Sequence, residues 1–193
     1  EASLKVLPAP AMEVTVRLTC GEEEAIALMS DWAGKPLPVT GTAFLGGDLS
    51  VRLSGAKPAV EAAMSRIGGY LVDRAAAAQF WTGIREQATP WFAGELPLWR
   101  LSVRATTPPL GLPGTQLIEW SGALRWLKSD ADAAVVCAAA KAAGGHATLF
   151  RGGDKSAGVF QPLSNELMKI HRRLKETLDP AGILNRGRLY PDF

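Results

Sequence analysis

The sequence predicts an α+β fold, in which one antiparallel sheet has helices packed on one face and is built from two ferredoxin-like halves. Segments that alternate between apolar and polar residues, as half-buried strands do, are separated by segments with a helical apolar stripe. Glycine pairs stand where turns are needed. The order β-α-β-β-α-β occurs once in full and once in degenerate form. With 193 residues, of which 47% are apolar and 21% charged, the chain suits a single globular domain.

The first half of the chain contains every element of the ferredoxin-like order. Residues 13–18 alternate in polarity and predict a strand. Residues 22–33 predict a helix, since glutamates at its first turn suit the positive end of the helix dipole and Gly34 follows its last turn. Residues 46–48 predict a hairpin turn. The other expected elements are strands at 39–45, 49–54 and 70–73 and a helix that Pro58 opens and residues 68–69 end.

The second half repeats this order after a connecting helix over residues 75 to about 88. A connection rich in proline and glycine, residues 106–114, replaces its first helix. Ser129 is expected to cap the next helix, over about residues 130–143. The remaining predicted elements are strands at 98–103, 116–120, 123–128 and 146–151 and a final helix at 163–178.

Composition excludes several classes of function. A net charge of +2 argues against a nucleic-acid binder that depends on phosphate contacts. No apolar run approaches the roughly 20 residues of a membrane span, and no signal peptide is expected at Glu1. Cys20 and Cys137 are far apart and fit a cytoplasmic protein. From Lys141 onward nine Lys/Arg stand against five Asp/Glu, which indicates either a solvated basic helix or a docking face for an acidic partner or cofactor.

Two segments carry a resemblance to a known family. The tail from Asp179 to Arg188 reads D-P-A-G-I-L-N-R-G-R. It resembles the C-terminal signature D-P-x-G-I-x-N-P-G-[KR] of FAD-linked oxidases of the vanillyl-alcohol oxidase type, with Arg186 where that family usually has proline. The phrase F-R-G-G-D at residues 150–154 resembles the family of FAD-binding subunits of bacterial glycolate oxidase. A weaker likeness to it lies in residues 3–8.

This resemblance implies the C-terminal cap domain of an FAD-dependent 2-hydroxy acid oxidoreductase, which converts glycolate to glyoxylate and passes hydride to the flavin. It implies a remnant strand and linker at residues 1–12, the cap at 13–179 and a tail at 180–193 that returns toward the flavin. An N-terminal domain that this chain lacks would bind most of the FAD, so the isolated chain is expected to be inactive. The implied partners are a second flavin subunit and an iron-sulfur subunit, through which the enzyme would reach the inner membrane. A non-catalytic ferredoxin-like module that binds a ligand or another subunit is the alternative.

The same resemblance assigns the flavin contacts to the tail. Asn185 would contact the flavin, Gly187 would allow close backbone approach, and Arg188 would meet the phosphates or a local carboxylate. The tail is rich in apolar residues, so we expect it to pack back on the sheet and to place Asn185 beside the flavin cleft.

Substrate contacts are expected at Arg151 and His146. Arg151 follows a strand and precedes two glycines, which suits bidentate carboxylate binding, although a local pair with Asp154 is an equal alternative. His146 opens the same strand and either faces a cleft or is an exposed end residue. His171 lies on an apolar helical stripe and is expected to be packed. With two histidines no histidine-built metal site is expected, and no general base is evident.

The loop aromatics Trp91 and Phe92 leave two interpretations open. Two large rings beside Pro90 in a loop indicate a surface that another domain or protein partner covers. Alternatively the loop folds back on the core of its own domain.

Overall fold

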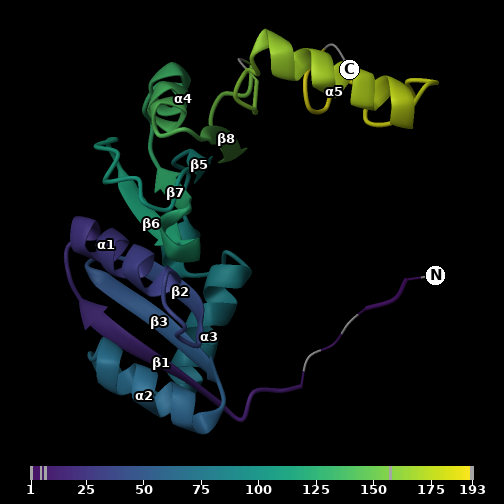
Figure 1. Cartoon of the computed structure of the whole chain (residues 1–193). Helices are drawn as coiled ribbons and strands as arrows, with labels where there is room; N and C mark the ends of the chain where they lie inside the picture. Colours follow the sequence, from purple (N-terminus) through teal and green to yellow (C-terminus); the bar gives the residue numbers. More distant parts are fainter. Residues whose placement is uncertain (1, 5, 7, 157, 192–193) are drawn as a thin grey trace.

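The computed structural model describes residues 2–4, 6, 8–156 and 158–191. Its centre is an eight-stranded sheet in the order β4-β1-β3-β2-β6-β7-β5-β8, antiparallel at every pairing (Figure 1). The strands are β1 (Met12–Thr19), β2 (Val39–Leu45), β3 (Asp48–Gly55), β4 (Tyr70–Leu71), β5 (Leu98–Ser102), β6 (Thr115–Glu119), β7 (Leu124–Lys128) and β8 (His146–Arg151). The helices are α1 (Glu22–Ala33), α2 (Lys57–Ile67), α3 (Arg74–Arg85), α4 (Ala133–Ala142) and α5 (Asn165–Leu178), with 3-10 turns η1 (Pro90–Phe92) and η2 (Trp120–Gly122).

The sheet confirms the predicted internal repeat. The first half has the strand order β4-β1-β3-β2, and the second half has the equivalent order β8-β5-β7-β6. The two halves meet where β2 pairs with β6, with Phe44 opposite Ile118 and Leu45 opposite Leu117. Because this junction is a regular antiparallel pairing, the two ferredoxin-like units share one continuous sheet.

The alternation along the strands separates two faces. In β1, Val16 points into the core under α1 and α2, whereas its neighbour Thr15 points to the other face. The helices α1, α2 and α4 of the two repeats cover the first face, as expected. The expectation of helices on one face is wrong for the connecting helix α3. It packs on the opposite face, where the Trp81 indole donates to the Thr15 hydroxyl at 2.9 Å and Ile84 lies in the core cluster of that face. This second face therefore carries polar groups beside the helix α3.

Most predicted boundaries agree with the structure within a few residues, but one helix cap is wrong. The cap of α4 is Asp132, whose carboxylate accepts from the Ala134 amide at 2.7 Å. Ser129 instead accepts from the Ala131 amide at 3.0 Å, because it is buried in the turn before the helix.

The Trp91–Phe92 loop folds back on its own core, which decides between the two interpretations. Phe92 is buried and its ring packs edge-on against Trp126 at 5.7 Å between centroids. The neighbouring Trp91 packs partly buried against the same cluster.

The final helix α5 differs most from expectation, because none of its residues, all of which the structure describes, is buried (Figure 1). It lies away from the sheet, and its apolar stripe is open to solvent in this chain. His171 is half-buried and its ring meets that of Tyr190 edge-on, 6.4 Å between centroids. The exposed apolar residues of α5 are Leu167, Ile170, Leu174 and Leu178.

The tail packs along α5, so the expectation that it packs on the sheet is wrong for residues 180–191. Asp179 is the reason, because its carboxylate pairs with Lys175 at 2.7 Å and accepts from the amides of Ile183 and Leu184 at 3.2 and 2.9 Å. These bonds reverse the chain directly after the helix. They also lower the pKa of Asp179 to about 2, chiefly through the hydrogen bond from Lys175.

Residues 2–4, 6 and 8–10 have no regular secondary structure, and β1 begins at Met12. Glu1, Lys5 and Leu7 of the expected remnant strand, and residues 192–193 of the tail, lie outside the described residues. In the part of the chain that the structure describes, no helix is long and apolar enough to cross a membrane.

Candidate functional site

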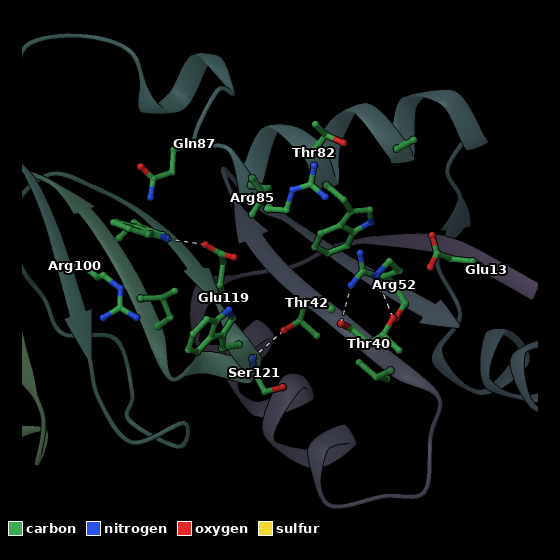
Figure 2. A pocket seen from close by; sticks show the side chains of 18 of the residues that line it. Glu13, Thr40, Thr42, Arg52, Thr82, Arg85, Gln87, Arg100, Glu119 and Ser121 are labelled. Carbon is green, nitrogen blue, oxygen red and sulfur yellow. Dashed lines mark hydrogen bonds between the residues drawn. The ribbon is translucent and has the colours of Figure 1, made fainter. Parts of the chain in front are cut away.

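A cleft of about 780 Å³ lies on the polar face of the sheet, where the two halves meet (Figure 2). We call it the junction cleft. The helix α3 borders it on one side, and strands of both repeats form its floor. Figure 2 shows side chains from both halves lying around it. Its polar lining residues are Glu13, Thr40, Thr42, Arg52, Thr82, Arg85, Gln87, Arg100, Glu119 and Ser121.

Three arginines give the junction cleft a positive lining, and two of them have partners. Arg52 donates from Nε to the Thr40 hydroxyl at 3.1 Å and from Nη2 to the Thr40 carbonyl at 3.0 Å. Arg85 pairs with the adjacent Glu86 at 2.7 Å in an exposed position. Within the described residues no hydrogen bond or ion pair engages the guanidinium of Arg100, which stacks over the Trp120 ring at 5.8 Å. Arg100 is thus the cation of this lining that remains available to a ligand.

An acidic group lies beside this cation. Glu119, at the end of β6, is half-buried, and its Oε1 accepts from the Trp126 indole at 2.6 Å. Burial raises the pKa of Glu119, while the Trp126 hydrogen bond and the charge of Arg100 act in the opposite direction. The site therefore combines a carboxyl that is easier to protonate than usual with an available guanidinium.

The turn after β6 has a strained backbone. Trp120 and Ser121 have φ angles of 50° and 54°, and Gly122 has 96°. The left-handed region disfavours residues with a Cβ, at a cost of about 1–3 kcal/mol each when they are held there. Two side chains hold the turn. The Thr42 hydroxyl accepts from the Ser121 amide at 2.9 Å, and the Arg125 Nε donates to the Gly122 carbonyl at 3.0 Å. Gly122 has no room for a side chain, because a Cβ there would meet the Ala105 carbonyl oxygen at 2.5 Å.

Arg151, the first expected substrate contact, lies at the rim of the cleft. Its Nη2 donates to Oε1 of Gln87, a lining residue, at 3.0 Å, and the adjacent Phe150 also lines the cleft. Asp154 is engaged by the amide and hydroxyl of Ser156, both at 2.8 Å. The local Arg151–Asp154 pair is therefore replaced by an Arg151–Gln87 contact.

His146, the second expected substrate contact, is not brought to this site. It is exposed at the opposite end of β8, where it pairs across the sheet with Ser102. Arg151 follows it by five residue steps along β8, about 17 Å at the usual rise. The structure thus places the two expected substrate contacts apart.

The three expected flavin contacts share one exposed turn on α5. Asn185 and Gly187 have φ angles of 48° and 65°, and the Arg188 amide donates to the Asn185 carbonyl at 3.1 Å. A Cβ at Gly187 would meet only the Pro191 carbonyl oxygen, at 4.0 Å, so open space surrounds it. The turn is accessible to a planar group from outside the chain, but it does not line the junction cleft. Among the described residues no group of three or more His, Cys, Asp or Glu side chains could hold a metal ion.

Sequence reasoning missed the residues that define the cleft, namely Arg100, Glu119 and Trp120. A signal was present at Arg100, since a charged residue stands between Trp99 and Leu101 in a strand whose other residues are mostly buried. The alternating pattern predicts Trp120 as the last residue of the strand at 116–120, and nothing in Trp-Ser-Gly indicates a left-handed tryptophan.

Comparison with known proteins agrees with the tail motif. Residues 151–189 match the family described as FAD linked oxidases, C-terminal domain. The resemblance to the FAD-linked oxidases is confirmed. Over all of its 193 residues the chain is also 43% identical to "Glycolate oxidase subunit GlcE" of Escherichia coli (strain K12). It spans 53% of that protein, so the chain covers about half the length of the curated relative it matches. The match to FAD-linked oxidases includes both Arg151 and the turn that carries Asn185.

Proposed function

We propose that the chain is the C-terminal part of a glycolate oxidase subunit, an FAD-dependent enzyme that oxidises a 2-hydroxy acid to the 2-oxo acid. One observation carries the proposal. The chain aligns over its full length, including both the cleft and the tail, with a subunit of glycolate oxidase at 43% identity. The family match to FAD-linked oxidases over residues 151–189 supports the cofactor.

The oxidation of glycolate removes a hydride from its carbinol carbon and a proton from its hydroxyl, and the flavin supplies the hydride acceptor when bound. The residues of this chain would bind and orient the acid and exclude water. The available guanidinium of Arg100 in the junction cleft favours an anionic substrate. Arg151 at the rim would contact the incoming carboxylate. His146 lies at the far end of β8, so it would contact substrate only at a second site completed by residues from another part of the enzyme.

The tail turn would meet the flavin. Asn185 and Gly187 are both in the left-handed region. Asn185 is exposed and Gly187 has open space around it, so the turn is compatible with close approach of a planar ring, and Arg188 would contact a phosphate or carboxylate. Most of the FAD would be held by the part of the protein that precedes this chain. That part would cover the apolar stripe of α5, with residues 1–12 as the linker and residues 180–193 returning toward the flavin.

The implied assembly contains a second flavin subunit and an iron-sulfur subunit, with cytoplasmic location and attachment to the inner membrane through those partners. The basic stretch after Lys141 is compatible with a docking role, because much of its charge lies on the exposed helix α5.

The direct test is anaerobic reduction of the flavin in the full-length protein purified with its partner subunits. Glycolate is expected to bleach the oxidised flavin spectrum and to yield glyoxylate in equal amount. A preparation with stoichiometric flavin that neither glycolate nor a longer 2-hydroxy acid reduces would contradict the proposal.

A further inference from the structure

The junction cleft contains a guanidinium that the fold does not use. Arg100 lies in β5, between β7 and β8, opposite Trp126 on one side and Thr148 on the other. It is half-buried, and within the described residues it makes neither a hydrogen bond nor an ion pair. Arginine heads that leave bulk water normally gain partners, because the charged form is otherwise poorly solvated. Arg100 is therefore available to a partner that the described residues do not supply.

A strained turn holds an indole beside this guanidinium. Trp120 is 65% exposed although it is large and apolar, and its left-handed backbone is disfavoured. The hydrogen bonds to Thr42 and from Arg125 keep the turn in this form. They hold the Trp120 ring beside the Arg100 guanidinium, whose Cζ lies 5.8 Å from the centroid of the ring. Backbone strain of this kind concentrates at ligand sites, where the surrounding structure maintains it.

On this basis, and resting on the proposed function, we propose that Arg100 is the group that anchors the substrate carboxylate in the junction cleft, with Trp120 as the adjoining wall. The ligand is a small 2-hydroxy monocarboxylate. The guanidinium beside the Trp120 ring has N–H groups that no described residue engages, and its N–H edge matches the two oxygens of a carboxylate. Arg52 and Arg85 are less suited, because both are committed to partners. Arg151, exposed and bound to Gln87, lies at the entrance.

Glu119 does not satisfy Arg100. Its Oε1 is held by the Trp126 indole, and no ion pair joins it to Arg100 among the described residues, although the two charges interact. A carboxylate that enters the cleft therefore meets a cation whose donors are available. The cavity of about 780 Å³ is much larger than a two- or three-carbon acid, so a second body must share or cover it.

The test uses the full-length flavoprotein in its native complex, with Arg100→Gln and Arg100→Lys as the principal variants. Arg85→Gln removes the same charge from the same cleft and controls for general electrostatics, and Arg66→Gln on the exposed face of α2 is a remote control. Two quantities are measured, the steady-state kinetics with glycolate and the dissociation constant of acetate, an unreactive monocarboxylate, from its perturbation of the flavin spectrum.

Arg100→Gln is expected to raise the KM for glycolate and the dissociation constant of acetate by about 10- to 100-fold, as for loss of a charge-assisted pair of hydrogen bonds. Arg100→Lys should recover part of the loss, and Arg85→Gln should change either quantity by less than about threefold, since that side chain is exposed and paired. Flavin content and melting temperature should stay at wild-type values, because Arg100 has no hydrogen bond to lose within the described part of the chain.

Equal effects of Arg100→Gln and Arg85→Gln would overturn the anchor, as would a loss of kcat and melting temperature with unchanged KM. If Arg100→Gln does not fold, Arg100→Lys and Trp120→Leu replace it. Each is expected to weaken acetate binding, and unchanged acetate binding in both would overturn the anchor. A wild-type flavin that no 2-hydroxy acid reduces would refute the proposed function instead. Acetate binding that Arg100→Gln abolishes would then still support the anion site, and absence of acetate binding to the wild type would refute it.

Discussion

Arg125 is the largest side chain that is fully buried among the described residues, and its replacement tests how the strained turn is held. Its guanidinium donates to the carbonyls of Gly122 at 3.0 Å and Pro108 at 3.2 Å, and also to that of Thr107. It thus ties η2 to the irregular connection that replaces a helix in the second repeat. Burial lowers the pKa of Arg125, and the Glu22 carboxylate acts in the opposite direction.

We predict that Arg125→Met destabilises the fold strongly. All three carbonyls would lose their donor. Pro108 is exposed, so its carbonyl can bind water instead, whereas Thr107 and Gly122 are buried, so their two carbonyls would be left without a partner. At about 1–3 kcal/mol for each unsatisfied buried group, the free energy of unfolding should fall by roughly 2–6 kcal/mol. The free energy of unfolding of Arg125→Lys should lie between those of the wild type and Arg125→Met, because one ammonium cannot reach all three acceptors.

Urea unfolding of the chain, followed by tryptophan fluorescence, measures this loss. The matched control is Arg66→Met on the exposed side of α2, where we expect a change within about 0.5 kcal/mol. If Arg125→Met costs less than about 1 kcal/mol, Arg125 does not hold the turn, and the account of strain at Trp120 loses its support.

Three further predictions concern the rim and the tail. Arg151→Lys should lower kcat/KM for glycolate by about 2- to 10-fold at constant flavin content, as for one exposed charge-assisted bond. Unchanged kinetics with a lower melting temperature would show that Arg151 only stabilises the fold through its hydrogen bond to Gln87. Asn185→Ala should lower flavin affinity or shift the flavin potential, with a stability change under about 1 kcal/mol because the residue is exposed; wild-type flavin content and potential would remove it from the site. Asp179 has its pKa lowered from 3.8 to about 2, so its contribution to the tail fold is complete above about pH 4 and is lost as the pH falls through about 2. Protease susceptibility of residues 180–191 should rise over that range but not in Asp179→Asn, which should be susceptible already at about pH 7.

Local pattern predicted the fold well because each half of the sheet is built from neighbouring segments. The alternation around Val16 and the glycine turns specify strands and hairpins directly, and the repeated order implies the same topology twice. The packing of α5 was not predictable. Its stripe from Leu167 to Leu178 is that of a buried helix, yet nothing in a helical stripe says whether the covering surface belongs to the same segment of chain.

The cleft was hidden for a different reason. Arg100 and Glu119 belong to the second repeat, whereas Thr42 and Arg52 come from the first, and only the β2–β6 junction brings them to one face. That pairing is non-local and has no signature in either segment. The tail was recognised from its motif, but its path was not, because the turn depends on the bonds from the amides of Ile183 and Leu184 to Asp179.

We propose that the junction cleft, and not another surface of the chain, receives the substrate. Hydrogen–deuterium exchange of the full-length flavoprotein, with and without saturating acetate, tests it most directly. Bound acetate is expected to add protection at β5 around Arg100 and at η2 from Trp120 to Gly122, and none at the His146 end of β8. Protection confined to the His146 end, or absent from both β5 and η2 while acetate is bound, would contradict the claim.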